Sequence, residues 1–327
     1  MSSINFRSLG LASIPAFLGG TLASGSSALG GLFSQPAPTA SSGLPFSAIY
    51  SFGDSLSDAG NLSTLTLHTL PAGPYVDGHF TNGPVWVQDL AAQLGLPIPQ
   101  ASLLGGTDFA YGGAETGSAP LHPQAPIDLP SQLMQFTLSH PAAIPHALYT
   151  VSVGSNDVLD ATAAYSANPG GALADVAQAV GNEVSFISAL AADGARDLVV
   201  LNVPDLGKTP QETGRGQGVA QIASYLSATY DAQLTASLAS LTAADHLNLH
   251  LVDAYSLLDQ AVANPSAFGL TNVTQPIWTG TYNNPANGTA SVTGAAQNSY
   301  LFFDNLHPTV TGHEFLAVAA HASFLAA

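Results

Sequence analysis

Cysteine is absent from this chain of 327 residues, and charged side chains are scarce. Without cysteine there can be no disulfide, no thiolate metal ligand and no cysteine nucleophile. Aspartate, glutamate, lysine and arginine together make up only 8 % of the residues, against about 25 % in an average soluble domain. The surface is therefore expected to consist largely of Ser, Thr, Asn, Gln, Gly and Ala side chains.

Basic residues are the scarcest charged class, with 4 lysines and arginines against 21 acidic residues and a net charge of −17. No segment collects enough bases to neutralise consecutive phosphates, which excludes nucleic acid as a partner. The same charge opposes docking on anionic membranes. No apolar run is long and continuous enough to span a bilayer, so stable membrane insertion is not expected.

Residues 1–44 differ in composition from the rest of the chain. A single base, Arg7, precedes a moderately apolar stretch from Leu9 to Leu22, and a tract rich in Gly, Ser, Ala and Pro follows. This pattern is typical of a secretory signal, with small residues for cleavage at 23–28. It is also typical of a disordered leader that has no targeting function. We predict a leader and linker over 1–44 and one folded domain over 45–327. A signal would make the protein secreted or bound to the cell surface, whereas a leader without a signal would be compatible with a cytoplasmic location.

From residue 46 onward, short apolar runs alternate with longer segments of helical period. The runs whose β-branched and aromatic residues predict strands are 46–52, 147–153, 197–203 and 247–255. The segments whose apolar spacing predicts helices are 84–94, 172–190 and 219–241. This alternation predicts an α/β fold, a three-layer sandwich with a central parallel sheet. Right-handed crossovers then place every strand-to-helix loop at one edge of the sheet.

A tract of Asn, Gly and Thr from Thr271 to Tyr300 carries no periodic pattern. It is longer than ordinary connections, so it is either a functional flap or an inert loop. Trp278 and Tyr282 give it some apolar surface, and a flap around Trp278 would suit an acyl chain.

Four short polar stretches follow or flank the predicted strands. They are GDSLSD at 53–58, DFAYGG at 108–113, GSND at 154–157 and DNLHP at 304–308. Taken alone, each can be a turn or the cap of a helix. Taken together, they contain every group that a serine hydrolase requires.

A serine hydroxyl becomes a good nucleophile only when a histidine removes its proton, and that imidazole needs a carboxylate to hold its tautomer. Ser55, His307 and Asp304 can fill these three roles. Asp304 and His307 lie three positions apart, so one turn can carry both. The first and last loops of a parallel sheet can share an edge, which allows Ser55 and His307 to meet.

The tetrahedral intermediate of acyl transfer also needs fixed hydrogen-bond donors for its oxyanion. The amide of Ser55, the amide of Gly112 and the side-chain NH2 of Asn156 fit this role. Either glycine of the pair Gly112 and Gly113 can donate, and we expect Gly112. Neither a metal ion nor a cofactor is required.

These four stretches resemble the conserved blocks of the GDSL family of lipases and esterases, also called SGNH hydrolases. The resemblance implies a flavodoxin-like hydrolase fold for 45–327, with Ser55 as nucleophile. It gives Gly112 and Asn156 the role of oxyanion donors, and the last block supplies Asp304 and His307. One position departs from the family pattern, since Asp108 stands where the second block usually opens with Asn. We expect Asp108 to be structural, as are Asp54, Asp58 and Asn61 around the nucleophile, and Asp157 to cap a helix.

The resemblance is strongest to the branch that includes phospholipases, lecithin acyltransferases and haemolysins. It implies cleavage of lipid or short-chain acyl esters through an acyl-serine intermediate. An acetylesterase acting on acetylated polysaccharide and a lipid acyltransferase remain as alternatives. A non-catalytic surface adhesin is a further alternative, but it would be expected to have lost a catalytic residue. The sequence does not determine acyl-chain length or oligomeric state.

Overall fold

The computed structural model describes residues 46–117, 127–140 and 142–324. The leader and linker predicted over 1–44 lie outside the described residues and stay a prediction. Across the described ranges, no helix is both long and apolar enough to cross a membrane.

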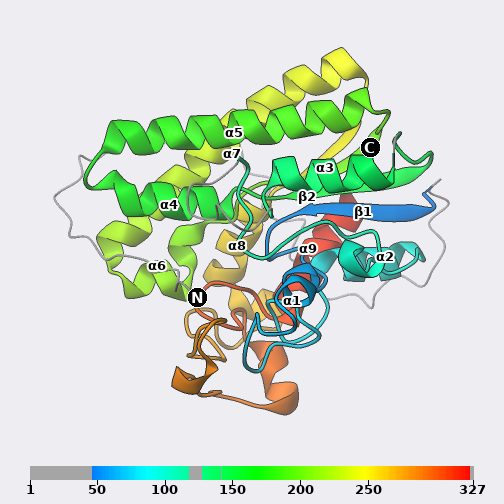
Figure 1. Ribbon diagram of the computed structural model, residues 1–327. Coiled ribbons are helices and arrows are strands. Elements are labelled where there is room, and N and C mark those ends of the chain that lie inside the picture. Colours follow the sequence, from blue (N-terminus) through cyan, green and yellow to red (C-terminus); the bar gives the residue numbers. More distant parts are fainter. Residues whose placement is uncertain (1–45, 118–126, 141, 325–327) are drawn as a thin grey trace.

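A sheet of four parallel strands forms the centre of the molecule (Figure 1). Its strands lie side by side in chain order, namely β1 (Ala48–Gly53), β2 (Ala147–Ser152), β3 (Asp197–Leu201) and β4 (Asn248–Val252). Each falls within or beside a run predicted from the sequence, because β-branched and aromatic side chains favour a sheet buried on both faces.

A short segment at 107–111 runs along the outer edge of β1. The amide of Ser51 donates to the carbonyl of Thr107 at 3.0 Å, and the amide of Phe109 donates to the carbonyl of Ser51 at 2.7 Å. If this segment is counted as a rudimentary strand, β1 lies between the second and third strands of the chain. That order is flavodoxin-like, and it places the topological switch point, where such folds bind ligands, at the end of β1.

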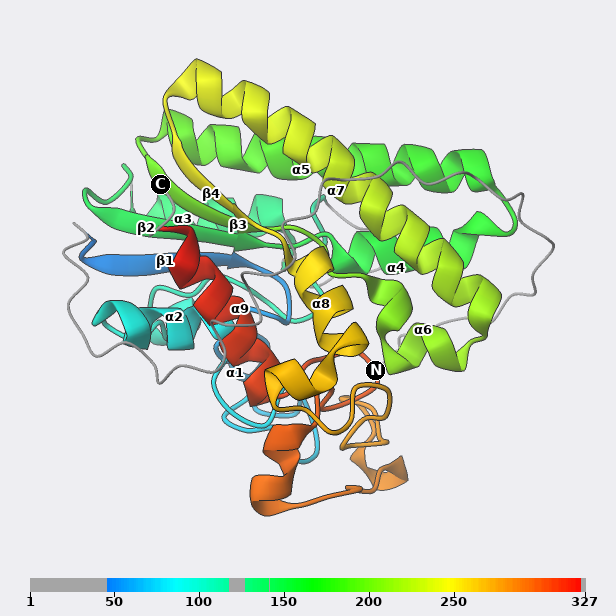
Figure 2. The ribbon, with the colours of Figure 1, turned by 180° about the vertical axis from the view of Figure 1, so that it is seen from behind.

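Helices cover both faces of the sheet and complete the three layers (Figures 1 and 2). One face packs against α3 (Leu129–Ser139), α4 (Ser155–Tyr165), α5 (Pro169–Ala192) and α7 (Gln217–Asp245). The other face packs against α2 (Trp86–Leu94), α8 (Ala254–Ala263) and α9 (Val310–Ser323). Side chains alternate along β1, with Tyr50 and Phe52 in the first layer and Ile49 in the second. The predicted three-layer α/β sandwich is therefore confirmed.

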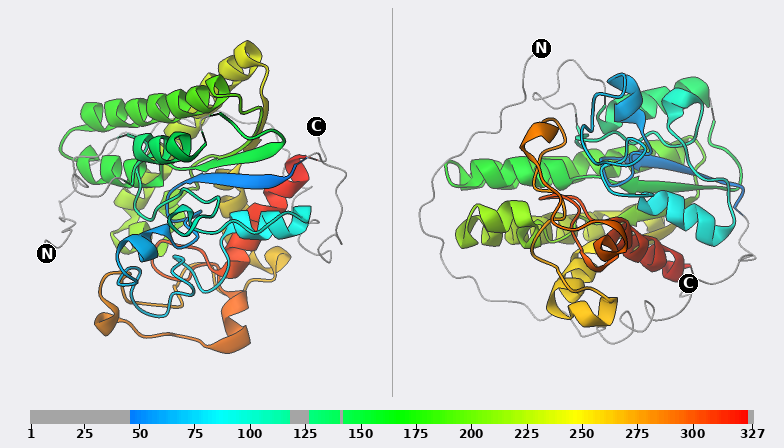
Figure 3. Two further views of the ribbon diagram at one scale, coloured as in Figure 1. Left: turned by 45° about the vertical axis from the view of Figure 1, so that its right-hand side comes forward. Right: turned by 90° about the horizontal axis from the view of Figure 1, so that it is seen from below.

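The segment 271–300 is an ordered excursion whose two ends are held together. The amide of Thr271 donates to the carbonyl of Ser299 at 2.8 Å, and the amide of Leu301 donates to the carbonyl of Asn272 at 2.9 Å. Figures 1 and 3 show this segment, in orange, on the side of the sheet opposite α5. Trp278 is buried within the segment, so it does not offer an apolar face to an acyl chain.

Carboxyl groups buried between the sheet and the long helices make stability depend on pH. Glu183 of α5 is fully buried and accepts a hydrogen bond from the Tyr230 hydroxyl at 2.6 Å. Burial raises the pKa of Glu183 to about 8, and burial likewise raises the pKa of Asp231 to about 8. At pH values between its usual pKa near 4.5 and its raised pKa of about 8, Glu183 is protonated in the folded protein and ionised in the unfolded chain.

The free energy of unfolding is therefore expected to fall as the pH rises from 5 to 9. The folded chain holds protons that the unfolded chain has lost, so this stabilisation is complete below the unfolded pKa and is lost as the pH rises through about 8. We expect calorimetry to give a Tm about 5 to 10 °C lower at pH 9 than at pH 5. Glu183→Gln, which cannot ionise, should show a smaller fall, whereas a Tm that rises over this range would contradict the assignment.

Candidate active site

Ser55 lies on a tight turn at the end of β1. The turn requires Gly53, whose φ is 138° and where an added Cβ would lie 1.9 Å from the carbonyl oxygen of Ser152. The amides on either side of Ser55 are also fixed, since Asp54 N–H donates to the carbonyl of Ser152 at 3.0 Å and Leu56 N–H donates to Asp54 Oδ1 at 3.0 Å. These contacts hold Ser55 at the switch point with 8 % of its surface exposed.

Asp304 and His307 come from a single turn just before α9, as predicted. Asp304 Oδ1 accepts hydrogen bonds from the amides of Leu306 at 2.8 Å and His307 at 2.7 Å. The 271–300 segment supports this turn, because the amide of Ile277 donates to the carbonyl of Phe302 at 3.1 Å. The segment thus holds the loop that carries the histidine and does not line the pocket beside Ser55.

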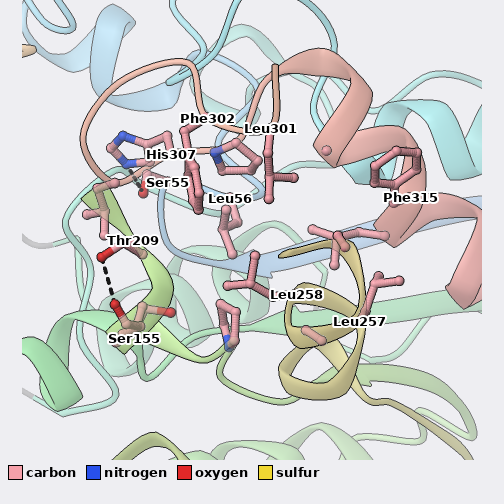
Figure 4. A pocket seen from close by; sticks show the side chains of 18 of the residues that line it. Ser55, Leu56, Ser155, Thr209, Leu257, Leu258, Leu301, Phe302, His307 and Phe315 are labelled. Atoms are coloured by element: carbon pink, nitrogen blue, oxygen red, sulfur yellow. Dashed lines mark hydrogen bonds between the residues drawn. The ribbon is translucent and has the colours of Figure 1, made fainter. Parts of the chain in front are cut away.

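The three side chains form one chain of hydrogen bonds. Ser55 Oγ lies 2.8 Å from His307 Nε2, and His307 Nδ1 lies 2.8 Å from Asp304 Oδ2. All three residues are at most 8 % exposed, and Figure 4 shows Ser55 and His307 facing each other. This is the arrangement in which a histidine can take the proton of a serine while a carboxylate holds the imidazole.

The charge on Asp304 is maintained by its partners. Burial alone raises its pKa, but the charge of His307 and hydrogen bonds from His307 and Tyr75 outweigh burial, so the pKa of Asp304 lies below its usual range. Asp304 is therefore a carboxylate wherever the protein is folded at neutral pH.

Two aromatic residues that the sequence analysis did not single out complete the surroundings of the histidine. The Tyr75 hydroxyl donates to Asp304 Oδ2 at 2.7 Å, and the ring of Phe80 packs against His307 with centroids 5.1 Å apart. Both lie between α1 (Asn61–Leu65) and α2, in a stretch without regular structure. No periodic pattern or block in the sequence marks them, so only the fold could find them.

Tyr75→Phe is expected to lower kcat/KM about tenfold with little change in KM. The substitution removes one of the hydrogen bonds that hold the Asp304 carboxylate in place, so Asp304 orients the His307 imidazole less firmly. Tyr282→Phe is the matched control, since the Tyr282 hydroxyl makes no hydrogen bond with the described residues. Equal rates for both variants and the parent would contradict this role for Tyr75.

The Gly112 amide is already paired, which corrects the expectation made for it. It donates to Asp58 Oδ2 at 2.7 Å in the buried interior. Asp58 also accepts from the amides of Gly60, Asn61 and Leu62 at 2.8, 2.6 and 3.2 Å. Asp58 thus ties the second block to the nucleophile turn, and Gly112 acts as part of that support.

Gly113 offers the free amide that Gly112 lacks. Its φ is 83°, an added Cβ would meet nothing within 4 Å, and no described residue accepts from its amide. The Ser55 amide is likewise without an acceptor among the described residues. Asn156 Nδ2 donates one hydrogen to the carbonyl of Ala114 at 2.8 Å, which orients the amide and leaves its second hydrogen for another acceptor.

The remaining acidic residues of the blocks have structural partners. Asp108 accepts from the amide of Ala59 at 2.7 Å and from Asn61 Nδ2 at 3.2 Å, so its predicted structural role is confirmed. Asp157 does not cap a helix but accepts from the amide and hydroxyl of Thr116 at 3.1 and 2.7 Å. Within the described part of the chain, no group of three or more His, Cys, Asp or Glu residues is arranged to hold a metal ion.

Comparison with known proteins matches residues 49–320 to the family described as GDSL-like Lipase/Acylhydrolase. The chain belongs to this family. Its relatives include esterase EstA of Pseudomonas aeruginosa, which is 32 % identical over 318 residues that cover 84 % of this chain and 46 % of EstA. The chain thus spans less than half the length of EstA. Family and relatives make this protein a carboxylic ester hydrolase.

Two further relatives extend the range of named activities. Phosphatidylcholine-sterol acyltransferase of Aeromonas hydrophila is 31 % identical over 256 residues, covering 77 % of this chain and 71 % of that protein. Thermolabile hemolysin of Vibrio parahaemolyticus is 23 % identical, covering 82 % and 62 %. Among solved structures, an extracellular lipase from Streptomyces rimosus is 18 % identical with a TM-score of 0.41, covering 85 % of this chain and 99 % of its own.

Proposed function

We propose that the hydrolase cleaves acyl esters through a covalent acyl-serine intermediate on Ser55. The observation that carries the proposal is the chain of hydrogen bonds from Ser55 through His307 to Asp304, at 2.8 Å for each step. Such a chain activates a hydroxyl that is otherwise a poor nucleophile.

In the first half of the reaction, His307 Nε2 takes the proton of Ser55 Oγ as the oxygen attacks the acyl carbonyl. Asp304 holds the imidazole and stabilises its charged form. The oxyanion is held by the amides of Ser55 and Gly113 and by Asn156 Nδ2. His307 then gives its proton to the departing alcohol, and the acyl group stays on Ser55.

In the second half, a water molecule attacks the acyl-serine while His307 again takes the proton, and His307 then returns it to Ser55 Oγ as the bond to the acyl group breaks and the carboxylic acid leaves. An alcohol in place of water would transfer the acyl group, which is the second candidate function. It is supported by the 31 % identity to a phosphatidylcholine-sterol acyltransferase. The two reactions share every residue named above and differ only in the molecule that accepts the acyl group.

The pocket beside Ser55 supports acyl esters over acetylated polysaccharides. Its polar lining residues gather near Ser55 and His307, and leucines, alanines and two phenylalanines make up most of the rest. An acetyl group is too short to cover such a lining, whereas a longer alkyl chain buries apolar surface along it. The intact set of catalytic residues also weighs against the non-catalytic adhesin.

Hydrolysis of p-nitrophenyl butyrate, combined with labelling by a fluorophosphonate, tests the proposal. We expect steady release of p-nitrophenol, loss of activity after labelling, and a single adduct on the peptide that carries Ser55. Adding an alcohol acceptor and measuring ester formation separates the acyltransferase from the hydrolase. A protein that is folded but neither hydrolyses the ester nor takes the label would contradict the proposal.

We also propose that the protein is exported, on the apolar stretch of residues 9–22 and the small residues that follow. N-terminal sequencing of the protein from culture medium or cell surface should find a chain that begins near residues 23–28. Protein found only in the cytoplasm with its first residues intact would contradict export.

A further inference from the structure

A narrow apolar pocket leads from the nucleophile into the layer between α8 and α9. Ser55 and His307 line one end, and Phe315 of α9 lies at the other end (Figure 4). In the same view the side chains of Leu257 and Leu258 lie along one wall and that of Leu301 along the opposite wall. The pocket is thus continuous with the reacting atoms.

One wall is a single stripe of α8. The residues of that helix that line the pocket are Ala254, Leu257, Leu258 and Ala261, a spacing that places all four on one helical face. From Ala254 to Ala261 the helix rises by seven steps, or about 10 Å at the usual rise of 1.5 Å per residue. Carbon–carbon bonds of about 1.5 Å advance an extended alkyl chain by about 1.25 Å per carbon. The stripe therefore matches a chain of about eight carbons.

The deep part of the pocket is lined without charge. Leu257, Ala261, Leu301 and Phe302 are each at most 4 % exposed and belong to the hydrophobic cluster on this face of the sheet. An apolar cavity of this kind stays dry and takes up hydrocarbon in preference to water. A small residue of α8, Ala261, lines it. A larger side chain at this position would narrow the pocket.

We propose that this pocket is the acyl-chain site of the hydrolase and that Ala261 and Phe315 set the longest chain that fits. The inference rests on the proposed function, since the chain enters as part of an ester bound at Ser55. The ester carbonyl lies at Ser55, the alkyl chain runs along the α8 stripe, and the alcohol part stays outside. Each methylene group that enters raises kcat/KM roughly fourfold, up to about eight carbons.

The test measures kcat/KM for p-nitrophenyl esters from acetate to palmitate. The parent should peak near octanoate. Ala261→Leu should shift the peak to chains about two carbons shorter, and Phe315→Leu should shift it to longer chains. Ala263→Leu is the matched control, because Ala263 lies on the same helix, is exposed and does not line the pocket.

Binding of octanoic acid to Ser55→Ala, measured by calorimetry, gives a readout that does not need catalysis. We expect binding with a negative heat-capacity change that Ala261→Leu in the same background weakens at least tenfold. If esters are hydrolysed by Ser55 but the profile is the same in all variants, the acyl site is wrong and the proposed function stands. If no ester is hydrolysed by the folded parent, the proposed function fails first, and bound octanoate would then mark a fatty-acid site only.

Discussion

Replacing Ser55 with alanine is expected to lower kcat/KM for p-nitrophenyl butyrate by about 10⁵- to 10⁶-fold while the Tm stays within a few degrees. The substitution removes the oxygen that attacks the ester. Neither His307 nor a water molecule can take its place in forming the covalent acyl intermediate. The fold should be unaffected, because the hydroxyl has no hydrogen-bond partner among the described residues other than His307 Nε2, at 2.8 Å. Initial rates on purified protein, with circular dichroism to verify folding, check both parts.

Ser57→Ala is the control for this substitution. Ser57 lies two residues further along the same turn and accepts a hydrogen bond from Trp86 Nε1 at 3.0 Å, away from the reacting atoms. We expect it to keep activity within about tenfold while losing about 1 to 3 kcal/mol of stability from the unpaired indole. If Ser55→Ala kept more than a hundredth of the parent activity, a different group would have to be the nucleophile.

Gly53→Ala is expected to be the most disruptive single substitution in the sheet. A methyl group there would lie 1.9 Å from the carbonyl oxygen of Ser152 on the neighbouring strand, and a φ of 138° is strained for any residue with a Cβ. Because β1 and β2 pair at this position, relief requires the strands to separate next to the nucleophile. We expect a loss of at least about 4 kcal/mol in the free energy of unfolding, or no soluble protein.

Gly95→Ala is the control for Gly53→Ala, because it measures the cost of the positive φ without a steric contact. Gly95 ends α2 with a φ of 69°, but an added Cβ there would meet nothing within 4 Å. Urea unfolding should give a loss of about 1 to 2 kcal/mol, which is the conformational penalty alone. Equal losses for the two variants would mean that the predicted contact with Ser152 is relieved without cost.

Much of the fold follows from patterns that are local in sequence. The runs that became β1, β2 and β3 are buried on both faces, as expected when helices cover both sides of a sheet, whereas β4 at the edge is only partly buried. The helices α2, α5 and α7 were predicted within a few residues because their apolar positions repeat at helical spacing. The sequence analysis did not identify α8, which begins within the run predicted as the fourth strand. Asp253, whose side chain accepts from the amide of Ser256 at 3.0 Å, marks where the strand ends and that helix begins.

Residues of the candidate site could be predicted where the chemistry allows only a few residue types. They could not be predicted where only the folded structure distinguishes one residue from the next in the chain. Ser55, Asp304 and His307 could be assigned to roles because only a few residue types can perform them. The choice between Gly112 and Gly113 depends on which amide Asp58 binds, and that contact links residues 54 positions apart. Tyr75 reaches Asp304 across 229 positions. Contacts of this kind leave no local pattern in the sequence.

His307 lies 252 residues after Ser55, and that separation determines when during its synthesis the hydrolase can become active. The ribosome makes the nucleophile turn, the second block and Asn156 first, and early parts of a domain can take shape while later parts are still being added. Until the turn with Asp304 and His307 arrives, Ser55 lacks the imidazole that lies 2.8 Å from its hydroxyl, and the proposed acyl transfer cannot begin. A chain that stops after β4 lacks both this turn and the helices α8 and α9, which cover one face of the sheet. Ester hydrolysis by this protein is therefore expected only from chains that extend past His307.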